Sequence, residues 1–438
     1  MLNLKESERQ LDLKRTHYIG NLNASLKGQK VVIGGWVEDL RELGKLTFLT
    51  LRDVTGVAQV VIIGEGVKQV KDLNRQSVVR VTGTVQETKS RDFPFEVKSE
   101  KMEILSRAVH PLPIDPIGRL ESNIDNRLNA RALDLRNQKT AAIFKMRHHV
   151  LQSIRKTLID LGFIEVNTPK IIGSASEGGA NLFSLKYFDK QAYLAQSPQL
   201  YKEQLTIGLE RVFEIASFYR AEKSHTVRHL TEFTSVDLES DFMDYLDVIE
   251  VLETVVVNVF EHVEKNCIEE QKALGINVRR PITPFERLTY KEAVEELGRE
   301  GIPLGSGDDL LDSHLRKLGE MHKGFYFLID WPINLKPFYI HEKEDDPTLS
   351  RSFDLQYGYL ELSSGGRRLH DPNKLKERLI EQGLNPSQFT DHLKAFDWGM
   401  PPHSGWGLGL DRLMSILTQI DNVREVVLYP RDPERLFP

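Results

Sequence analysis

The sequence predicts an α+β multidomain protein: a small β-barrel, then a larger domain in which helices flank an antiparallel sheet. Between residues 30 and 106, apolar residues recur with a period close to two, as in half-buried strands. After residue 139, strand-like and helix-like segments follow each other without the regular alternation of a doubly wound fold. The 438 residues also exceed what one ordinary core needs, which indicates two or three domains.

Five strand-like runs make up the first region: KVVIGGWVEDL, LTFLTLRD, VAQVVII, SVVRVTGTVQ and FPFEVKSEKMEIL. The run EGVKQVKDL, between the third and the fourth, is expected to be a short helix. Five strands with a helix after the third is the order of an OB-fold, a barrel that commonly binds single-stranded nucleic acid. A barrel with only a structural role is the alternative.

A segment rich in Pro, Asp and Asn, RAVHPLPIDPIGRLESNIDNR, follows the barrel and indicates a linker. We therefore expect an N-terminal extension and barrel at residues 1–106, a linker at 107–138 and a second domain at 139–438.

The second domain is expected to begin with a helix, TAAIFKMRHHVLQSIRKTLIDLG, and a strand, FIEVNTPKII, with Pro169 at an edge or bulge. Three strands follow, AYLAQSP, RVFEIASFYR and VDLESDF, and then a long helix from about Tyr245 to Glu264. FYFLIDWPI, PFYI and SFDLQYGYLEL continue the sheet, and a last helix begins near Gly409. In the strand before Arg220 the expected inward side chains are Phe213, Ile215 and Ser217.

Composition excludes several classes of protein. The 40% hydrophobic and 28% charged residues are typical of a globular protein, and the net charge of −6 shows no global signal for a polyanion partner. Cys267 is the single cysteine, which excludes an internal disulfide framework and makes zinc unexpected. There is no apolar run of about 18 residues and no signal-peptide core. We expect a cytoplasmic protein that does not enter membranes.

The stretch FYRAEKSHTVRHLTEF, residues 218–233, concentrates charge between two strand-like runs. A hairpin here would aim Arg220 and Glu222 from one strand end, and Arg228 and His229 from the other, into one cavity. Arginine forks match phosphate oxygens, so the arrangement suits a triphosphate. By itself, however, the stretch favours a solvated loop that holds local ion pairs.

Two downstream stretches support the phosphate interpretation. HSGWGLGLDRLMSIL places glycines before a helix, where free N–H groups favour anions. SFDLQYGYLELSSGGRRLHD carries Asp354, Glu361, Ser363 and Ser364, hard oxygen donors that suit Mg²⁺. The sequence has no GxxxxGK[ST] motif, so a P-loop cannot account for phosphate binding.

Three ordered segments resemble the signature motifs of class II aminoacyl-tRNA synthetases: LGFIEVNTPKII, FYRAEKSHTVRHLTEF and GLGLDRL. With the barrel in front and YPRDPERLFP at the end, the chain is similar to subclass IIb, and within it to the aspartate enzymes of archaeal type. The resemblance runs from about residue 15 to the last residue. It implies a class II catalytic domain, ATP as substrate, Mg²⁺ as cofactor and a homodimer through the first motif.

For ATP, the resemblance implies two catalytic arginines: Arg220 on the α-phosphate and the amino acid carboxylate, and Arg412 on adenine and the γ-phosphate. Glu222 would contact adenine, Phe233 would stack on it, and the outer phosphates would meet two further residues, Arg228 and His229. The metal ligands would be Glu361, Ser364 and Asp354. The remaining implied ATP contacts are Ala221, Leu230, Gly409, Leu410 and Asp411.

For L-aspartate, the resemblance implies that Lys202 and Arg368 bind the side-chain carboxylate, with Asp237 as the partner of the lysine. Glu177 would bind the α-ammonium group. The remaining implied contacts are Gln199, Leu200, Tyr201, Arg220 and Ser364. Asparagine enzymes of the subclass generally lack the lysine, so Lys202 favours aspartate, and buried cations would reject a neutral amide.

For tRNA(Asp), the family pattern in GWVEDLR, FLTLRD and VAQVV implies an anticodon site on the barrel. Phe48 would stack on a base, Gln59 would hydrogen-bond one, and Arg41 belongs to the same pattern. Phe48 as a plain core residue is the alternative. Acidic residues at Glu38 and Asp92, positions that influence tRNA choice in archaeal relatives, favour relaxed specificity that includes tRNA(Asn).

Three other functions compete with this interpretation. An asparaginyl enzyme of the same subclass would share the ATP motifs. An AMP-forming asparagine synthetase on the same catalytic fold would lack the barrel. A catalytically silent tRNA-binding paralogue would have lost Arg220, Glu361 or Arg412, and all three are present.

Overall fold

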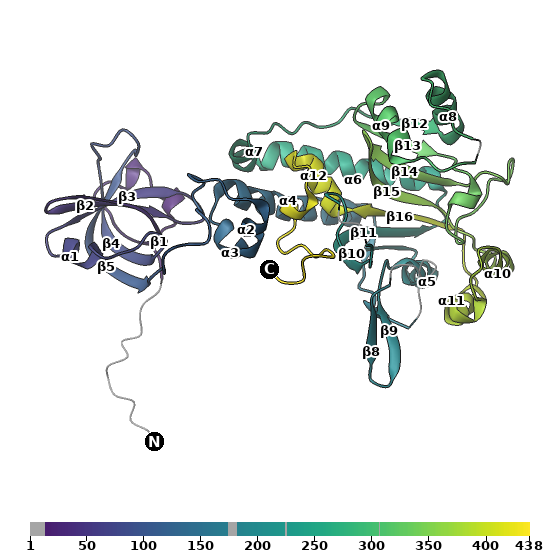
Figure 1. Ribbon diagram of the computed structural model, residues 1–438, viewed down its shortest axis with the longest axis horizontal. Helices are drawn as coiled ribbons and strands as arrows, with labels where there is room; N and C mark the ends of the chain where they lie inside the picture. The colour runs from purple at the N-terminus through teal and green to yellow at the C-terminus, as the bar shows by residue number, and fades with distance from the viewer. Residues whose placement is uncertain (1–13, 174–181, 224–225, 306) are drawn as a thin grey trace. The chain divides into compact units, whose positions relative to one another are not determined.

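The structure is a computed structural model that describes residues 14–173, 182–223, 226–305 and 307–438. The chain divides into two compact units, residues 1–126 and 127–438, and each is described by itself (Figure 1). Glu177, expected to bind the α-ammonium group, lies outside the described residues.

The first unit contains a closed five-stranded barrel in the order β1-β2-β3-β5-β4, counted over its described residues. Its elements are β1 (Lys30–Leu43), β2 (Leu46–Arg52), β3 (Val57–Ile63), α1 (Gly66–Val70), β4 (Val78–Gln86) and β5 (Glu96–Ser106), preceded by short 3₁₀ turns at Ile19–Asn21 and Ala24–Leu26. The alternating side chains Val31, Ile33, Leu49 and Leu51 are fully buried in its core. The predicted OB-fold order, with a helix between the third and fourth strands, is confirmed.

The second unit is built on a mixed, mainly antiparallel sheet of eight strands among the described residues, in the order β12-β13-β14-β15-β16-β11-β10-β6. Its central strands pair antiparallel, and only β12 with β13 and β6 with β10 pair parallel. The strands are β6 (Ile164–Glu165), β10 (Arg211–Tyr219), β11 (Glu232–Asp241), β12 (Glu286–Thr289), β13 (Phe325–Ile329), β14 (Ser352–Tyr357), β15 (Leu360–Arg367) and β16 (His403–Gly409). The predicted antiparallel sheet flanked by helices is confirmed.

Helices cover this sheet (Figure 1). The main core joins it to α4 (Gln138–Asp160), α6 (Tyr245–Asn266) and α12 (Leu410–Thr418), so the three helices expected in this domain are present. Asp244 caps α6 with a capping box, which explains its sharp start after β11. The other helices are α2 (Ile124–Asn129), α3 (Arg131–Asp134), α5 (Gln199–Leu209), α7 (Ile268–Leu274), α8 (Tyr290–Arg299), α9 (Asp312–Met321), α10 (Pro372–Glu381) and α11 (Thr390–Phe396), with 3₁₀ turns at Ile333–Leu335, Pro386–Phe389 and Val423–Val426.

Two expected strands are wrong. FIEVNTPKII does not form one strand: β6 ends at Glu165, and the chain then crosses to β7 (Ile171–Ile172), which pairs with β9 (Lys190–Leu194) and β8 (Ser184–Tyr187) in a separate small sheet. Pro169 lies in the crossing, where a residue without an N–H costs no ladder bond. PFYI is a turn with one isolated bridge at Ile340, because Phe338 and Tyr339 pack into a cluster with α10 and α11.

The expected inward set on β10 is also incomplete. Phe213 is buried, but so are Val212, Glu214 and Phe218 on the opposite face of the strand. Phe213 packs in the main core on one face of the strand, while Phe218 belongs to a separate cluster on the other face, so both faces carry buried side chains. Alternation along the sequence therefore could not identify which face lines the core.

Candidate active site

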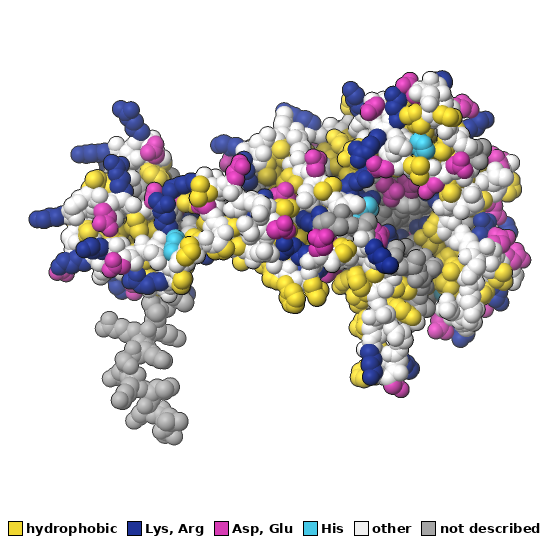
Figure 2. Space-filling view, in the orientation of Figure 1, with side chains coloured by type: hydrophobic (Ala, Val, Ile, Leu, Met, Phe, Trp, Pro, Cys, Tyr) yellow, Lys and Arg dark blue, Asp and Glu magenta, His cyan; other side chains and the backbone are white. Residues whose placement is uncertain are grey.

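A cavity of about 380 Å³ opens in the second unit, beside the β10–β11 hairpin. Its walls come from α5, the hairpin, the segment around residues 336–340, the strands β15 and β16, and the start of α12. Charged side chains gather around the hollow in the space-filling view (Figure 2). Most residues expected from the sequence line this one cavity: Gln199, Lys202, Arg220, Glu222, Arg228, His229, Leu230, Phe233, Asp237, Glu361, Ser364, Arg368, Gly409, Asp411 and Arg412.

Five of the expected site residues that the structure describes in this unit are not part of the cavity wall: Leu200, Tyr201, Ala221, Asp354 and Leu410. Leu200 and Leu410 pack into hydrophobic clusters, and Tyr201 packs against the cluster around Phe218. Ala221 also lies outside the lining. The side chains of Leu200, Tyr201 and Leu410 help to hold α5 and α12 in place, so these three residues would reach a ligand through the backbone at most.

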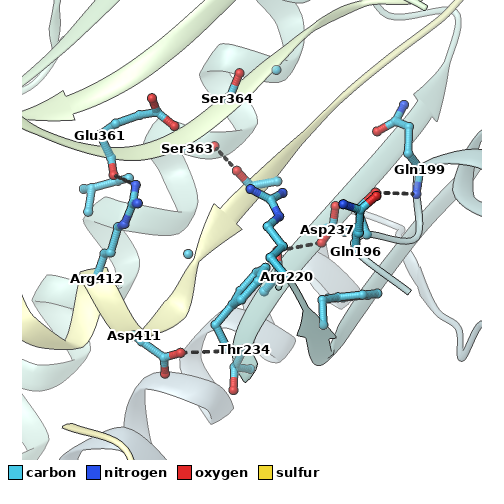
Figure 3. Close-up of a pocket in the computed structure, with 18 of the residues that line it drawn as sticks. Gln196, Gln199, Arg220, Thr234, Asp237, Glu361, Ser363, Ser364, Asp411 and Arg412 are labelled. Carbon is cyan, nitrogen blue, oxygen red and sulfur yellow. Dashed lines mark hydrogen bonds between the residues drawn. The ribbon is translucent and has the colours of Figure 1, made fainter. Parts of the chain in front are cut away.

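The β10–β11 hairpin forms as expected, with Phe218 opposite Phe233 and Tyr219 opposite Glu232. Arg220 follows directly, and its backbone N–H donates to the carbonyl of Thr231 at 2.9 Å. Its guanidinium lies 5.2 Å from the centre of the Phe233 ring, a cation–π distance. In Figure 3 Arg220 lies between Arg412 and Glu361 at one end of the cavity and Gln199 and Asp237 at the other.

Arg412 projects from the first turn of α12, and its Nη1 donates to the carbonyl of Glu361 at 2.7 Å. Asp411 fixes this turn: one carboxylate oxygen accepts from Arg147 at 2.6 Å and the other from the N–H of Thr234 at 2.9 Å. Asp411 therefore ties α12 to α4 and β11. Arg147 lies on α4, outside the motifs that suggested the site, and nothing in the residue pattern around it marks it as part of the site.

Positive charge dominates the end of the cavity near α12. The pKa of His229 is lowered by burial and by the nearby Arg412, Arg228 and Arg220, only partly opposed by Glu222. The same cations would stabilise an anion bound at this end of the cavity. Arg228 itself donates to Asp312 of α9 at 2.7 Å and lies over the ring of Tyr359.

Two carboxylates meet where β14 and β15 pair. Asp354 is opposite Ser364 in the register, and its charge, after burial, is the main cause of the raised pKa of Glu361. Lys336, which the sequence analysis missed, donates to one oxygen of Asp354 at 2.8 Å. The other buried oxygen of Asp354 has no hydrogen-bond donor among the described residues. Mutually repelling carboxylates with an unsatisfied oxygen fit a divalent cation, although no group of three or more Asp, Glu, His or Cys side chains forms a metal site in the described chain.

The opposite end of the cavity holds a buried ionic network. The Lys202 ammonium donates to Asp237 at 3.1 Å and to the carbonyl of Trp406 at 3.1 Å. Arg368 donates from Nε and Nη2 to the two oxygens of Glu239 at 2.9 and 3.2 Å. Glu239 was missed from the sequence because only the pairing of β11 with β16 brings it under Arg368.

Comparison with known proteins identifies the family of this chain. Residues 123–433 match the family described as tRNA synthetases class II (D, K and N), which covers most of the chain. The chain therefore belongs to the class II tRNA synthetases. Residues 31–105 of this synthetase match the OB-fold nucleic acid binding domain described as tRNA anti-codon.

Relatives of the synthetase carry two related names. It is 45% identical to the aspartate--tRNA(Asp/Asn) ligase of Methanothermobacter thermautotrophicus over 98% of this chain and 99% of that one. It is also 45% identical to the aspartate--tRNA(Asp) ligase of Picrophilus torridus, over 93% and 97%. Among solved structures, asparaginyl-tRNA synthetase from Pyrococcus horikoshii with asparaginyl-adenylate has a TM-score of 0.90 and 34% identity, covering 97% of this chain and all of that one.

On the barrel, the expected anticodon residues share one outer face. Arg41 is opposite Phe48 in the β1–β2 register, and Gln59 is opposite Thr50 in the β2–β3 register. Phe48 is half-buried and lies outside the core cluster, so its interpretation as a plain core residue is wrong. The Gln59 amide donates to Glu96 at 2.7 Å, which leaves its carbonyl oxygen to accept from a base. Asp92 is exposed in the loop before β5, and Glu38 forms an ion pair with Arg52.

Proposed function

We propose that this synthetase uses ATP to activate L-aspartate as aspartyl-adenylate and transfers the aspartyl group to the 3′-hydroxyl of tRNA(Asp). The observation that carries the choice of amino acid is the buried Lys202–Asp237 pair beside Arg368. The fold alone cannot decide, because an asparaginyl enzyme shares it at a TM-score of 0.90. A barrel ahead of the catalytic unit argues against an AMP-forming asparagine synthetase.

The chemistry needs no side-chain nucleophile. The carboxylate of aspartate attacks the α-phosphorus of ATP in line and pyrophosphate leaves, while the protein positions the groups and neutralises charge. We assign Arg220 to the α-phosphate and the attacking carboxylate, and Arg412 to the far end of the nucleotide. Phe233 would stack on adenine. Arg228 would have to leave Asp312 to reach the outer phosphates.

We propose that Glu361, Asp354 and Ser364 hold Mg²⁺, with Lys336 as a fixed positive charge beside Asp354. When bound, the ion neutralises the phosphate oxygens of the nucleotide. The raised pKa of Glu361, caused first by burial and then by Asp354, supports this assignment, since a cation at this position would relieve both effects. Ser364 would supply a neutral oxygen.

We propose a homodimer that forms through the surface of α4 and the segment after it. Ile159, Ile164 and Ile171 are exposed there, and β6 is an edge strand with an unpaired side. Exposed apolar residues beside an open strand edge favour association. No helix in the described part of the chain has the length and apolar character needed to span a membrane, and we place the enzyme in the cytoplasm.

The proposed choice of amino acid is tested by exchange of labelled pyrophosphate into ATP without tRNA. We expect exchange with aspartate and at least about a thousandfold lower kcat/KM with asparagine, because a neutral amide carries no negative charge to interact with Lys202 and Arg368. Protein without any amino acid is the control. Exchange with asparagine in place of aspartate would make the Lys202 argument wrong.

We further propose that the enzyme charges tRNA(Asn) as well as tRNA(Asp). Glu38 is neutralised by its ion pair with Arg52, and Asp92 is exposed to solvent. Neither residue therefore presents an unpaired buried charge that would exclude the anticodon base of tRNA(Asn). With transcripts of both tRNAs and labelled aspartate, we expect kcat/KM values within about tenfold, since a lost base contact costs only about 1–3 kcal/mol. Phe48→Ala should weaken both by a similar factor. A preference for tRNA(Asp) above a hundredfold would contradict the proposal.

A further inference from the structure

A second ionic cluster lies directly behind the Lys202 and Arg368 network and has no part in the chemistry described above. Glu203 follows Lys202 on α5 and is fully buried. One of its oxygens accepts from the amide of Gln199 at 2.5 Å, and Gln199 lines the cavity. The other oxygen lies 3.6 Å from Nε2 of His403 and 3.6 Å from Nε2 of His392.

Hydrogen bonds define the protons on both histidine rings. Nδ1 of His403 lies 2.8 Å from the carbonyl of Pro401, which can only accept, so Nδ1 carries a proton. Nε2 of His403 then faces the Glu203 carboxylate either as a bare lone pair or, in the imidazolium form, as a donor. The amide of Gln204 donates to Nδ1 of His392, which puts the proton of a neutral His392 on Nε2, again toward Glu203.

The charged form of His403 is the stable one. Facing a buried carboxylate with a lone pair would leave both groups unsatisfied in a site without solvent. The pKa of His403 is raised because Glu203 and Glu239 outweigh the effect of its burial, and that of Glu203 is lowered by His392 and His403 despite its own burial. The two shifts agree in direction, as they should for one ion pair.

This cluster is physically joined to the amino acid end of the cavity. The backbone N–H of Arg368 donates to the carbonyl of His403 at 2.9 Å, and Lys202 precedes Glu203 in the chain. Both cations assigned to the substrate carboxylate are thus anchored to the histidine-carboxylate cluster. Without the charge of His403, the two permanent cations, Lys202 and Arg368, would face four buried carboxylates. These are Asp237, Glu239, Glu203 and Asp241, the last of which lies on β11 opposite His403 of β16.

We propose that His403, held as an imidazolium by Glu203, is a positioning and specificity-determining residue that offsets negative charge behind the pocket and so permits a carboxylate side chain to bind. The inference rests on the proposed function, because it concerns an acidic amino acid. His403 touches no reacting atom. It acts through Glu203, Glu239 and Arg368, and its effect is on the binding of aspartate more than on that of ATP.

The proposed role of His403 is tested by a double-mutant cycle of His403 and Glu203. His403→Gln removes the positive charge, retains a donor toward Glu203, and is expected to raise the KM for aspartate roughly ten- to a hundredfold, the size expected for one unscreened charge. The KM for ATP should change less than about threefold on the same grounds, because the phosphate end is farther away. Adding Glu203→Gln removes the unpaired carboxylate, so the double variant should recover most of the aspartate affinity.

His322→Gln is the matched control. His322 also lies between two carboxylates, Glu286 and Glu296 at 2.9 and 2.7 Å, but it does not line the cavity, and its loss should leave the KM for aspartate unchanged. If His403→Gln does not fold, the ring ¹⁵N shifts of His403 at neutral pH in the wild-type enzyme and in Glu203→Gln decide instead. Imidazolium in the first and neutral imidazole in the second are expected.

Several results would overturn the inference. A double variant as impaired as His403→Gln, a parallel rise in the KM for ATP, or a neutral His403 ring in the wild type would each show a purely structural role. The wild-type exchange assay reports on the proposed function separately. If the wild type activates asparagine, the cycle measured with asparagine should be flat, and both proposals fail.

Discussion

Arg220→Ala is expected to lower pyrophosphate exchange with aspartate by about 10³-fold or more, the effect of removing a preorganised donor from a transition state. Arg220 is placed at the middle of the cavity, between Arg412, at the end that we propose for the nucleotide, and Asp237, at the end that we propose for the amino acid (Figure 3). At that position its guanidinium can neutralise charge on the α-phosphate and on the attacking carboxylate together. The loss should therefore appear in kcat and not only in the KM values.

The control for this variant is Arg211→Ala at the other end of the same strand. Arg211 donates to the carbonyl of Leu161 at 3.1 Å and does not line the cavity, so its loss should leave exchange nearly unchanged. Binding of tRNA, followed by filter retention or fluorescence, should remain close to that of the wild type for Arg220→Ala, since the residues that we propose for anticodon binding are on the barrel. Normal exchange with lost tRNA binding would overturn the role assigned to Arg220.

The parts of the fold that the sequence predicts well are those in which local periodicity and tertiary burial agree. The barrel strands alternate because one face of each is buried, as with Leu49 and Leu51 beside the half-buried Phe48. Prediction fails where tertiary contacts override the local pattern. The apolar run at Phe338 and Tyr339 has a strand-like composition, but its partners in α10 and α11 are distant in sequence and hold it as a turn.

The site shows the same division. Residues within the three motifs, such as Arg220 and Arg412, can be found because the motif itself supplies the signal. Glu239, Lys336 and Arg147 cannot, since each is an ordinary charged residue until strand pairing or helix packing brings it to a partner. These missed residues hold the predicted ones in place. Sequence reasoning thus identifies groups that would touch a ligand more readily than the groups that orient them.

Arg368→Gln is expected to lower kcat/KM for aspartate by about 10³-fold, because the site that we propose for the substrate carboxylate loses one of its two buried cations. This substitution also leaves Glu239 buried without its bidentate partner, which should cost about 3–5 kcal/mol of stability. A lower activity of the single variant could therefore reflect misfolding alone. Glu239→Gln in the same chain separates the two effects.

The double variant Arg368→Gln with Glu239→Gln removes both charges and leaves two amides able to hydrogen-bond each other. Its midpoint of thermal unfolding should return toward that of the wild type, because no buried charge is left unpaired. Activation of aspartate should stay about 10³-fold low, since Lys202 alone then faces the substrate carboxylate, while the KM for ATP stays near its original value. Recovery of aspartate activation together with stability would mean that Arg368 serves only to neutralise Glu239, and that Lys202 alone selects the amino acid.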